Sequence, residues 1–173
     1  MKKGAIVYWL LPEKGERELF CQIIRIFCHE LDAPEFEPHL TLLVSEKNRP
    51  TPKAVLRCLK AEPVRLRIRE TATSSKFTKT LFVRFRSDGA LEKLVSDLGT
   101  AAKVRPRRLR DPHVSLLYKK TSARTTRELA STLKFPFRDV VFDSIVAVRL
   151  RLPVRTRADV EGWRIVARKS LRG

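Results

Sequence analysis

Two matching octapeptides constrain the fold of this chain more than any other feature of the sequence. Residues Glu37–Val44 read EPHLTLLV and residues Asp111–Tyr118 read DPHVSLLY, so both copies run acid, Pro, His, aliphatic, hydroxyl, Leu, Leu, apolar. A strand pattern followed by a helix pattern precedes each copy, at Ala5–Leu31 and at Thr80–Leu98. The repeat therefore predicts two related lobes, each of which presents one motif strand.

The spacing within each motif predicts what the two strands present. Side chains alternate along a strand, so His39 and Thr41 point to one face, and His113 and Ser115 do the same on the second strand. If the lobes pack about a pseudo-twofold axis, the two pairs meet in the groove between them. We expect a phosphate-sized site there, with two proton-transfer groups and two hydrogen-bond donors.

The rest of the chain alternates between strand and helix patterns, with several connections short enough to join antiparallel neighbours. This predicts an α+β fold, bilobal over residues 1–173, in which two pseudo-symmetric lobes of antiparallel sheet with outer helices surround a central cleft. The predicted strands are Ala5–Leu11, Pro38–Val44, Val64–Arg69, Thr80–Arg86, Val114–Tyr118, one or two within Pro136–Leu150, and Trp163–Arg168. The predicted helices are Pro12–Leu31, Thr51–Leu59 with a Thr-Pro start, one marked by the apolar residues Leu91, Leu94, Val95 and Leu98, and one capped by the box Thr125-x-x-Glu128 and ending near Leu133.

The charge of the chain predicts an anionic partner. The formal net charge is +18 over 173 residues, and residues 101–173 carry 19 Lys and Arg against only six Asp and Glu. A field of this sign concentrates nucleotides, RNA or phosphate esters. A basic surface that serves only solubility would have the same composition, so the charge predicts the kind of partner and not the reaction.

Cysteine usage and the apolar runs predict a soluble, cytoplasmic protein. The count of three cysteines is odd, and no Cys-x-x-Cys pair occurs, which favours reduced thiols over a disulfide framework. The apolar run Ala5–Leu11 is too short for a signal peptide and fits a buried N-terminal strand. No run approaches the length of a membrane span, so we expect no membrane partner. We also expect a monomer.

Paired histidines suit the opening of a cyclic phosphodiester. That reaction needs a base to take a proton from water and an acid to protonate the leaving alkoxide, and histidine can do both because its ordinary pKa lies near 6.5. Thr41 and Ser115 would then donate hydrogen bonds to the non-bridging oxygens. The third histidine, His29, lies in a helix pattern and is interpreted as structural. No third ligand completes a zinc set around His39 and His113, so we expect no metal and no cofactor.

The two motifs resemble the signature tetrapeptides of the 2H phosphoesterase superfamily, as His39-Leu40-Thr41-Leu42 and His113-Val114-Ser115-Leu116. Further segments resemble its cyclic phosphodiesterase branch, which is related to the 2′-5′ RNA ligase-like proteins. These are the approach Pro34–His39, the extension of motif two to Tyr118, and the closing pattern from Phe137-Arg138 to Trp163–Val166. The resemblance implies a bilobal, metal-free fold that hydrolyses nucleoside 2′,3′-cyclic phosphates or ADP-ribose 1″,2″-cyclic phosphate. It also implies that Tyr118 approaches the phosphate, although strict alternation would turn it away from His113.

Two other functions remain open. The charge favours an RNA end-processing enzyme that uses the same histidine pair on a polynucleotide, and the basic run Lys103–Arg110 could line its cleft. A protein of another class, a non-catalytic RNA- or nucleotide-binding module, could keep the same scaffold. Phe77, Phe82 and Trp163 could stack on a base but are more often core residues in such patterns. The sequence does not assign which histidine is base and which is acid.

Overall fold

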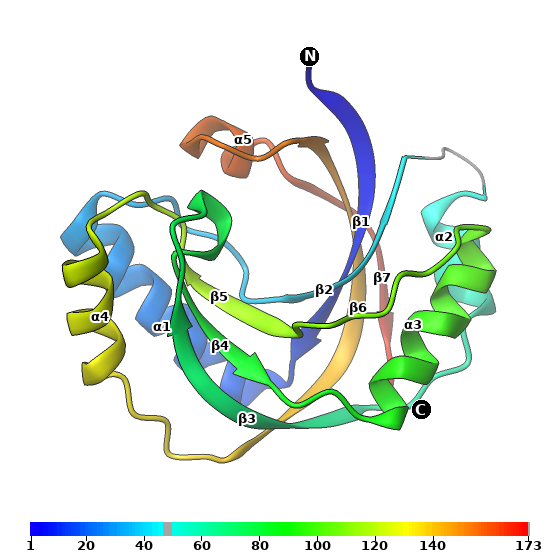
Figure 1. Ribbon diagram of the computed structural model, residues 1–173. Helices are drawn as coiled ribbons and strands as arrows, with labels where there is room; N and C mark the ends of the chain where they lie inside the picture. Colours follow the sequence, from blue (N-terminus) through cyan, green and yellow to red (C-terminus); the bar gives the residue numbers. More distant parts are fainter. Residues whose placement is uncertain (47–49, 173) are drawn as a thin grey trace.

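The computed structural model describes residues 1–46 and 50–172, and in this part of the chain every strand belongs to one antiparallel sheet (Figure 1). Helices cover the outside of that sheet, so the predicted α+β class is confirmed. In chain order the elements are β1 (Lys3–Pro12), α1 (Lys14–Leu31), β2 (Leu40–Ser45), α2 (Pro52–Cys58), β3 (Val64–Thr73), the 3-10 turn η1 (Phe77–Lys79), β4 (Leu81–Phe85), α3 (Gly89–Ala102), β5 (His113–Leu117), α4 (Ala123–Thr132), β6 (Asp139–Leu152), α5 (Arg157–Glu161) and β7 (Arg164–Ser170).

The long strand β6 joins the two halves of the sheet. The strand order is β1-β2-β5-β4-β3-β6-β7, and β1 also pairs with β6. Residues 139–142 of β6 pair with β3, whereas residues 144–149 pair with β7. One half is therefore β2-β1-β6-β7 and the other is β5-β4-β3, and the two halves meet again where β2 pairs with β5. The predicted segment Pro136–Leu150 thus contains one continuous strand and not two; β6 begins at Asp139, runs on to Leu152 and changes partners along its length.

Each motif strand follows a helix that packs on the opposite half. Helix α1 comes after β1 and contacts β5 of the other half as well as β1, and α3 comes after β4 and contacts β2 of the other half. Helix α2 lies beside α3 and contacts β7, while α4 contacts β3. Figure 1 shows the result, with α1 and α4 on one side of the molecule and α2 and α3 on the other. The two strand–helix–strand units thus exchange their helices, and this fixes the motif strands against each other.

Strand β1 is buried on both faces, as its continuous apolar run predicts. Tyr8 and Leu10 pack into the main core between the sheet and the helices. Val7, Trp9 and Leu11 point to the opposite face, where they form a second apolar cluster with residues of β6. The face that carries Trp9 is the one that also carries the first histidine of the repeat, as described below.

Two predicted helix starts are wrong. Pro12 still pairs with Phe142 in the sheet, so α1 begins at Lys14. Helix α4 begins at Ala123 because the Ser122 side chain accepts a hydrogen bond from the Thr125 amide, which makes Thr125 an interior residue and removes the predicted capping box. A capping box does occur at the start of α5, where Thr156 and Asp159 form it; the sequence analysis did not predict α5.

Cys21 and Cys28 are half-buried, Cys58 is exposed, and all three are free thiols. Among the described residues, no helix combines the length and the apolar character that a membrane crossing requires.

Candidate active site

The two motif strands pair directly with each other. Strands β2 and β5 run antiparallel with Leu40 opposite Val114, and both of these side chains are fully buried in the main core. Continuing this register by one residue in each direction sets His39 opposite Ser115 and Thr41 opposite His113. All four polar side chains leave the strands on the face opposite Leu40 and Val114. The structure therefore brings the two predicted His/hydroxyl pairs together, each histidine across from the hydroxyl of the other motif.

Both histidines are held by the same hydrogen bond. The Nδ1 atom of His39 lies 2.6 Å from the Glu37 carbonyl oxygen, and Nδ1 of His113 lies 2.7 Å from the Asp111 carbonyl oxygen. A carbonyl can only accept, so Nδ1 donates in both rings and carries the proton when the ring is neutral. Each neutral ring therefore keeps the lone pair of Nε2 for other partners. In both copies the accepting carbonyl belongs to the residue two positions before the histidine, so the two bonds are equivalent.

Aromatic rings surround His39. Its ring stacks on Trp9, with centroids 3.7 Å apart and planes 13° apart, and Trp163 meets it edge-on at 5.8 Å. Only 7% of His39 is exposed. This burial lowers the pKa of His39 to about 4; the bond to the Glu37 carbonyl opposes the shift, and the charge of His113 adds to it. His39 is therefore a neutral imidazole at pH 7.

Charged groups surround His113, which is half-buried and meets Phe82 edge-on at 5.3 Å. The Asp111 carboxylate accepts a hydrogen bond from Arg84 at 2.6 Å and forms an ion pair with Lys79. Burial lowers the pKa of His113, and the positive charges of Lys79 and Arg84 lower it further. The bond to the Asp111 carbonyl and the charge of the Asp111 carboxylate oppose the shift.

The two hydroxyls differ in their hydrogen bonds. Ser115 Oγ donates to the Thr78 carbonyl oxygen at 2.9 Å, in the turn η1. The half-buried Thr41 hydroxyl has no hydrogen-bond partner among residues 1–46 and 50–172. An oxyanion could therefore accept from Thr41 directly, whereas Ser115 would have to exchange its bond to Thr78.

Tyr118 lies just past the end of β5, so strand alternation does not fix its direction. Its ring stacks on Phe36, with centroids 3.9 Å and planes 11° apart, and its phenol hydrogen-bonds with the Ser115 side chain. The ring also contacts Trp163 edge-on at 5.9 Å. Burial raises the pKa of the phenol, so it stays protonated and can donate. Tyr118 thus stands on the side of the hydroxyl and histidine groups.

The surroundings of the histidines include Trp9, which the sequence analysis did not single out, and Phe82 and Trp163, which it named only as possible base-stacking residues. Trp9 pairs with Thr41 on the first half, and Phe82 pairs with Ser115 on the second, so the two aromatics occupy equivalent positions beside the two motifs. Trp9 lies inside an apolar run and gives no separate signal in the sequence. Asp111 does give one, because the acid position is common to both octapeptides. Trp163 contributes an indole Nε1 that is buried without a partner among the described residues.

The basic run 103–110 follows α3 and leads into motif two. Pro106 packs against Gly99 of α3, so closely that a Cβ added to Gly99 would lie 2.8 Å from the proline ring. The run's Arg side chains are exposed. A cavity of about 220 Å³ lies between this run and α3. The contact between Pro106 and Gly99 places residues 103–110 against α3.

Potential metal donors do not gather in the described part of the chain, where no group of three His, Cys, Asp or Glu side chains comes together. The polar groups that the two motifs bring together are two imidazoles, two hydroxyls and a phenol.

No family model and no curated protein matches this sequence. Solved structures do match over the full chain. Escherichia coli LigT complexed with 3′-AMP superposes with a TM-score of 0.59 at 16% identity, covering 100% of both chains. TT0787 of Thermus thermophilus gives a TM-score of 0.58 at 20% identity, covering 100% of this chain and 99% of that one. E. coli LigT complexed with phosphate gives 0.55 at 14% identity, covering 98% of each chain. The fold that the resemblance implies is confirmed.

Proposed function

We propose that this chain, which has the fold of LigT, is a 2H-type phosphodiesterase that opens a cyclic phosphodiester without a metal. The observation that carries the proposal is the matched pair of Nδ1–carbonyl bonds, which leaves Nε2 of both His39 and His113 free on one face of paired strands. A duplicated packing strand would need the leucines of the repeat but not two identically oriented imidazoles.

The proposed reaction is an in-line hydrolysis. A water oxygen forms a bond to phosphorus while one bridging P–O bond of the ring breaks. One histidine takes a proton from the water, and the other gives a proton to the leaving alkoxide, so the product is a ring-opened phosphomonoester. Suitable substrates are a nucleoside 2′,3′-cyclic phosphate or ADP-ribose 1″,2″-cyclic phosphate.

The surroundings of the two rings favour His39 as the base and His113 as the acid. His39 is neutral at any pH well above about 4, so its Nε2 lone pair can accept the proton of water. His113 is less enclosed and has the Asp111 carboxylate beside it. A bound phosphate would add a second negative charge and favour its protonated form. Thr41, Ser115 and Tyr118 would donate hydrogen bonds to the non-bridging oxygens.

Bound molecules in the similar structures support a phosphate-containing ligand. E. coli LigT has been solved with 3′-AMP and with phosphate, and both contain the group that this reaction would leave as product. For this chain we propose a nucleotide or an RNA end with a cyclic phosphate as the substrate, with the protein acting as a cytoplasmic monomer.

A second candidate, RNA end processing by the same histidine pair, is favoured by the +18 charge, which exceeds what a mononucleotide needs. It predicts much higher activity on a cyclic-ended oligonucleotide than on a mononucleotide. A non-catalytic RNA- or nucleotide-binding module instead predicts tight binding without product, unaffected by the loss of either histidine.

The test is hydrolysis of a 2′,3′-cyclic nucleotide by chelator-treated protein, with kcat/KM followed from pH 4 to 9 and the product isomer identified. We expect metal-independent turnover with a bell-shaped profile. The base must be neutral and the acid protonated, so the optimum for the free enzyme should lie above about 4 and below 6.5. No turnover on this substrate, on ADP-ribose cyclic phosphate or on cyclic-ended RNA would refute the proposed activity.

A further inference from the structure

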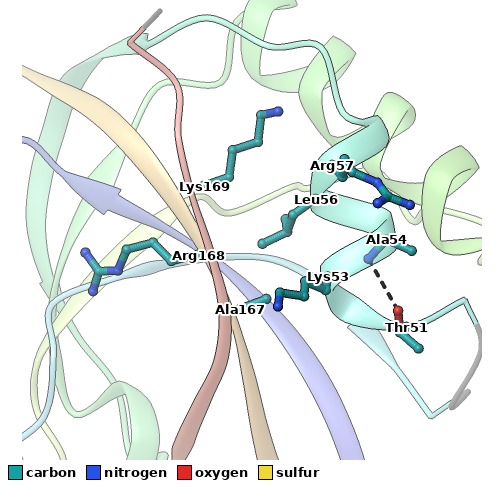
Figure 2. Close-up of a pocket in the computed structure, with 8 residues that line it drawn as sticks. All are labelled: Thr51, Lys53, Ala54, Leu56, Arg57, Ala167, Arg168 and Lys169. Atoms are coloured by element: carbon teal, nitrogen blue, oxygen red, sulfur yellow. Dashed lines mark hydrogen bonds between the residues drawn. The ribbon is translucent and has the colours of Figure 1, made fainter.

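A basic groove lies between α2 and β7. Figure 2 shows the cavity of about 460 Å³ in this groove, whose charged lining residues are Lys53 and Arg57 from α2 and Arg168 and Lys169 from β7. None of the residues that line this cavity is acidic. We call this cavity the α2–β7 groove and count Lys53, Arg57 and Lys169 as its cations, because the Arg168 side chain leaves β7 on the other side.

The three cations of the α2–β7 groove, and Arg168 beside them, have no ion-pair partner among the described residues, whereas many other basic residues of the molecule do. Arg84 pairs with Glu70 and Asp111, Arg157 with Asp32, and Arg172 with Glu13 and Asp143, to name three. Lys169 is also half-buried. An anionic ligand would supply the missing charge.

These cations come from two elements that face each other, α2 and β7. Lys53 and Arg57 are four residues apart on α2, so about 6 Å of helix rise separates them on one face. Lys169 comes from the facing strand and points toward the helix, whereas the Arg168 side chain leaves β7 on the other side (Figure 2). Arg168 pairs in register with Val146, which packs with Trp9 on the histidine face of the sheet. The edge strand β7 therefore carries cations toward both faces.

A second cavity adjoins the α2–β7 groove. It has a volume of about 740 Å³, shares Arg57 and Lys169 with the first, and adds Lys60. It also includes Glu62 and the ion pair of Lys93 with Asp97, so its charge is mixed. The basic surface thus continues past the α2–β7 groove in one direction, which suits an extended polyanion better than a single phosphate.

We propose that the α2–β7 groove binds the phosphate backbone of single-stranded nucleic acid, with little selectivity for base. The groove has no aromatic lining residue on which a base could stack, so contacts to phosphate dominate. A lipid surface fits less well, because the exposed large apolar residues Met1, Ile26, Val44 and Ile165 lie outside the lining of the groove. The proposal concerns binding alone and does not depend on hydrolysis at the histidines.

The experiment compares two charge-reversal triples by titrating a fluorescein-labelled oligo-uridylate that ends in a 3′-hydroxyl. One triple is Lys53→Glu, Arg57→Glu and Lys169→Glu. The matched control is Arg65→Glu, Arg127→Glu and Lys134→Glu, which changes the net charge equally at exposed residues on β3, α4 and the segment after α4. Because Lys169 is half-buried, a neutral triple with Gln at the same three groove positions is titrated as well.

We expect the groove triple to weaken binding about tenfold or more at low salt and to reduce the slope of log K against log salt by about 2, roughly 0.7 for each lost phosphate contact. The Gln triple should show a smaller loss in the same direction, and the control should stay near the parent. Hydrolysis of a cyclic mononucleotide and the melting temperature report separately on the histidine site and on folding. Equal losses in the groove and control triples would overturn the proposal, as would a groove triple that binds like the parent. Loss of binding to anionic vesicles, with RNA binding unchanged, would assign the groove to lipid and also overturn it.

Discussion

The motifs of His39 and His113 share one backbone geometry but have different surroundings. In both, Nδ1 donates to the carbonyl of the acidic residue two positions earlier. His39 then lies flat against Trp9 and is almost fully buried, whereas His113 is half-buried beside the ion pairs of Asp111. The corresponding acid of the first motif, Glu37, has only a loose ion pair with Arg17 at 3.6 Å.

This difference teaches how a duplicated motif can supply two different groups. The local sequence sets the tautomer of each imidazole, and the neighbouring strands set its pKa. Trp9 and Phe82 occupy equivalent positions, but the flat contact with Trp9 encloses His39, whereas Phe82 meets His113 edge-on and also lies under Lys79, whose Nζ is 4.4 Å from the ring centroid. One repeated octapeptide can therefore hold two imidazoles in different electrostatic surroundings.

Removing either imidazole should have the largest effect. His39→Ala and His113→Ala should each lower kcat by about 10²- to 10⁴-fold, because each takes away one of two proton transfers. His29→Ala is the matched control, since His29 is exposed on α1, and it should behave like the parent. Steady-state kinetics with circular dichroism on all three variants checks this. Near-parental activity in either motif variant would refute the paired mechanism.

The burial of His39 should make folding sensitive to pH. In the folded protein the pKa of His39 is about 4, whereas the unfolded chain titrates near 6.5. Between these values the unfolded state binds a proton that the folded state does not, so the free energy of unfolding falls as pH falls from 6.5 toward 4, by about 3 kcal/mol at most. Urea unfolding at pH 7 and pH 4.5 should show a smaller loss for His39→Asn than for the parent or for His29→Asn. The same loss in all three proteins would contradict an enclosed, neutral His39.

A smaller effect, on the pH profile of kcat/KM, should distinguish the surroundings of His113, which are charged, from those of His39, which are apolar. Lys79 lowers the pKa of His113, so Lys79→Gln should raise that pKa and move the alkaline limb of the kcat/KM profile to higher pH. Arg17→Gln removes the cation that faces the acid of the other motif, and it should leave both limbs in place. A pH profile measured on the two variants side by side makes the comparison. Equal displacement of the alkaline limb in both would mean that only overall charge acts on the site.

The sequence predicted the placement of the four motif residues better than it predicted their surroundings. Strict alternation in the octapeptides was enough to place His39, Thr41, His113 and Ser115 on one face. It could not predict Trp9 as the stacking partner of His39, because that contact depends on the β1–β2 register, with a bulge after Tyr8. Helix boundaries failed where local signals competed: Ser122 and Thr125 are both good N-caps, and only the packed helix shows that Ser122 is the one used.

The sequence by itself determined that each motif forms a strand and to which face the polar residues of that strand point, whereas the hydrogen bond that fixes each imidazole was seen only in the structure. The strand and its faces depend on neighbours within a few residues, through the pleat of a strand. Only the tertiary structure decided that β2 pairs with β5, that the helices are exchanged between the halves, and that one histidine is enclosed by aromatic rings while the other lies among charged groups. Those outcomes depend on contacts between segments far apart in the chain, and burial and Coulomb interactions, which set a pKa, follow position in space and not position in sequence.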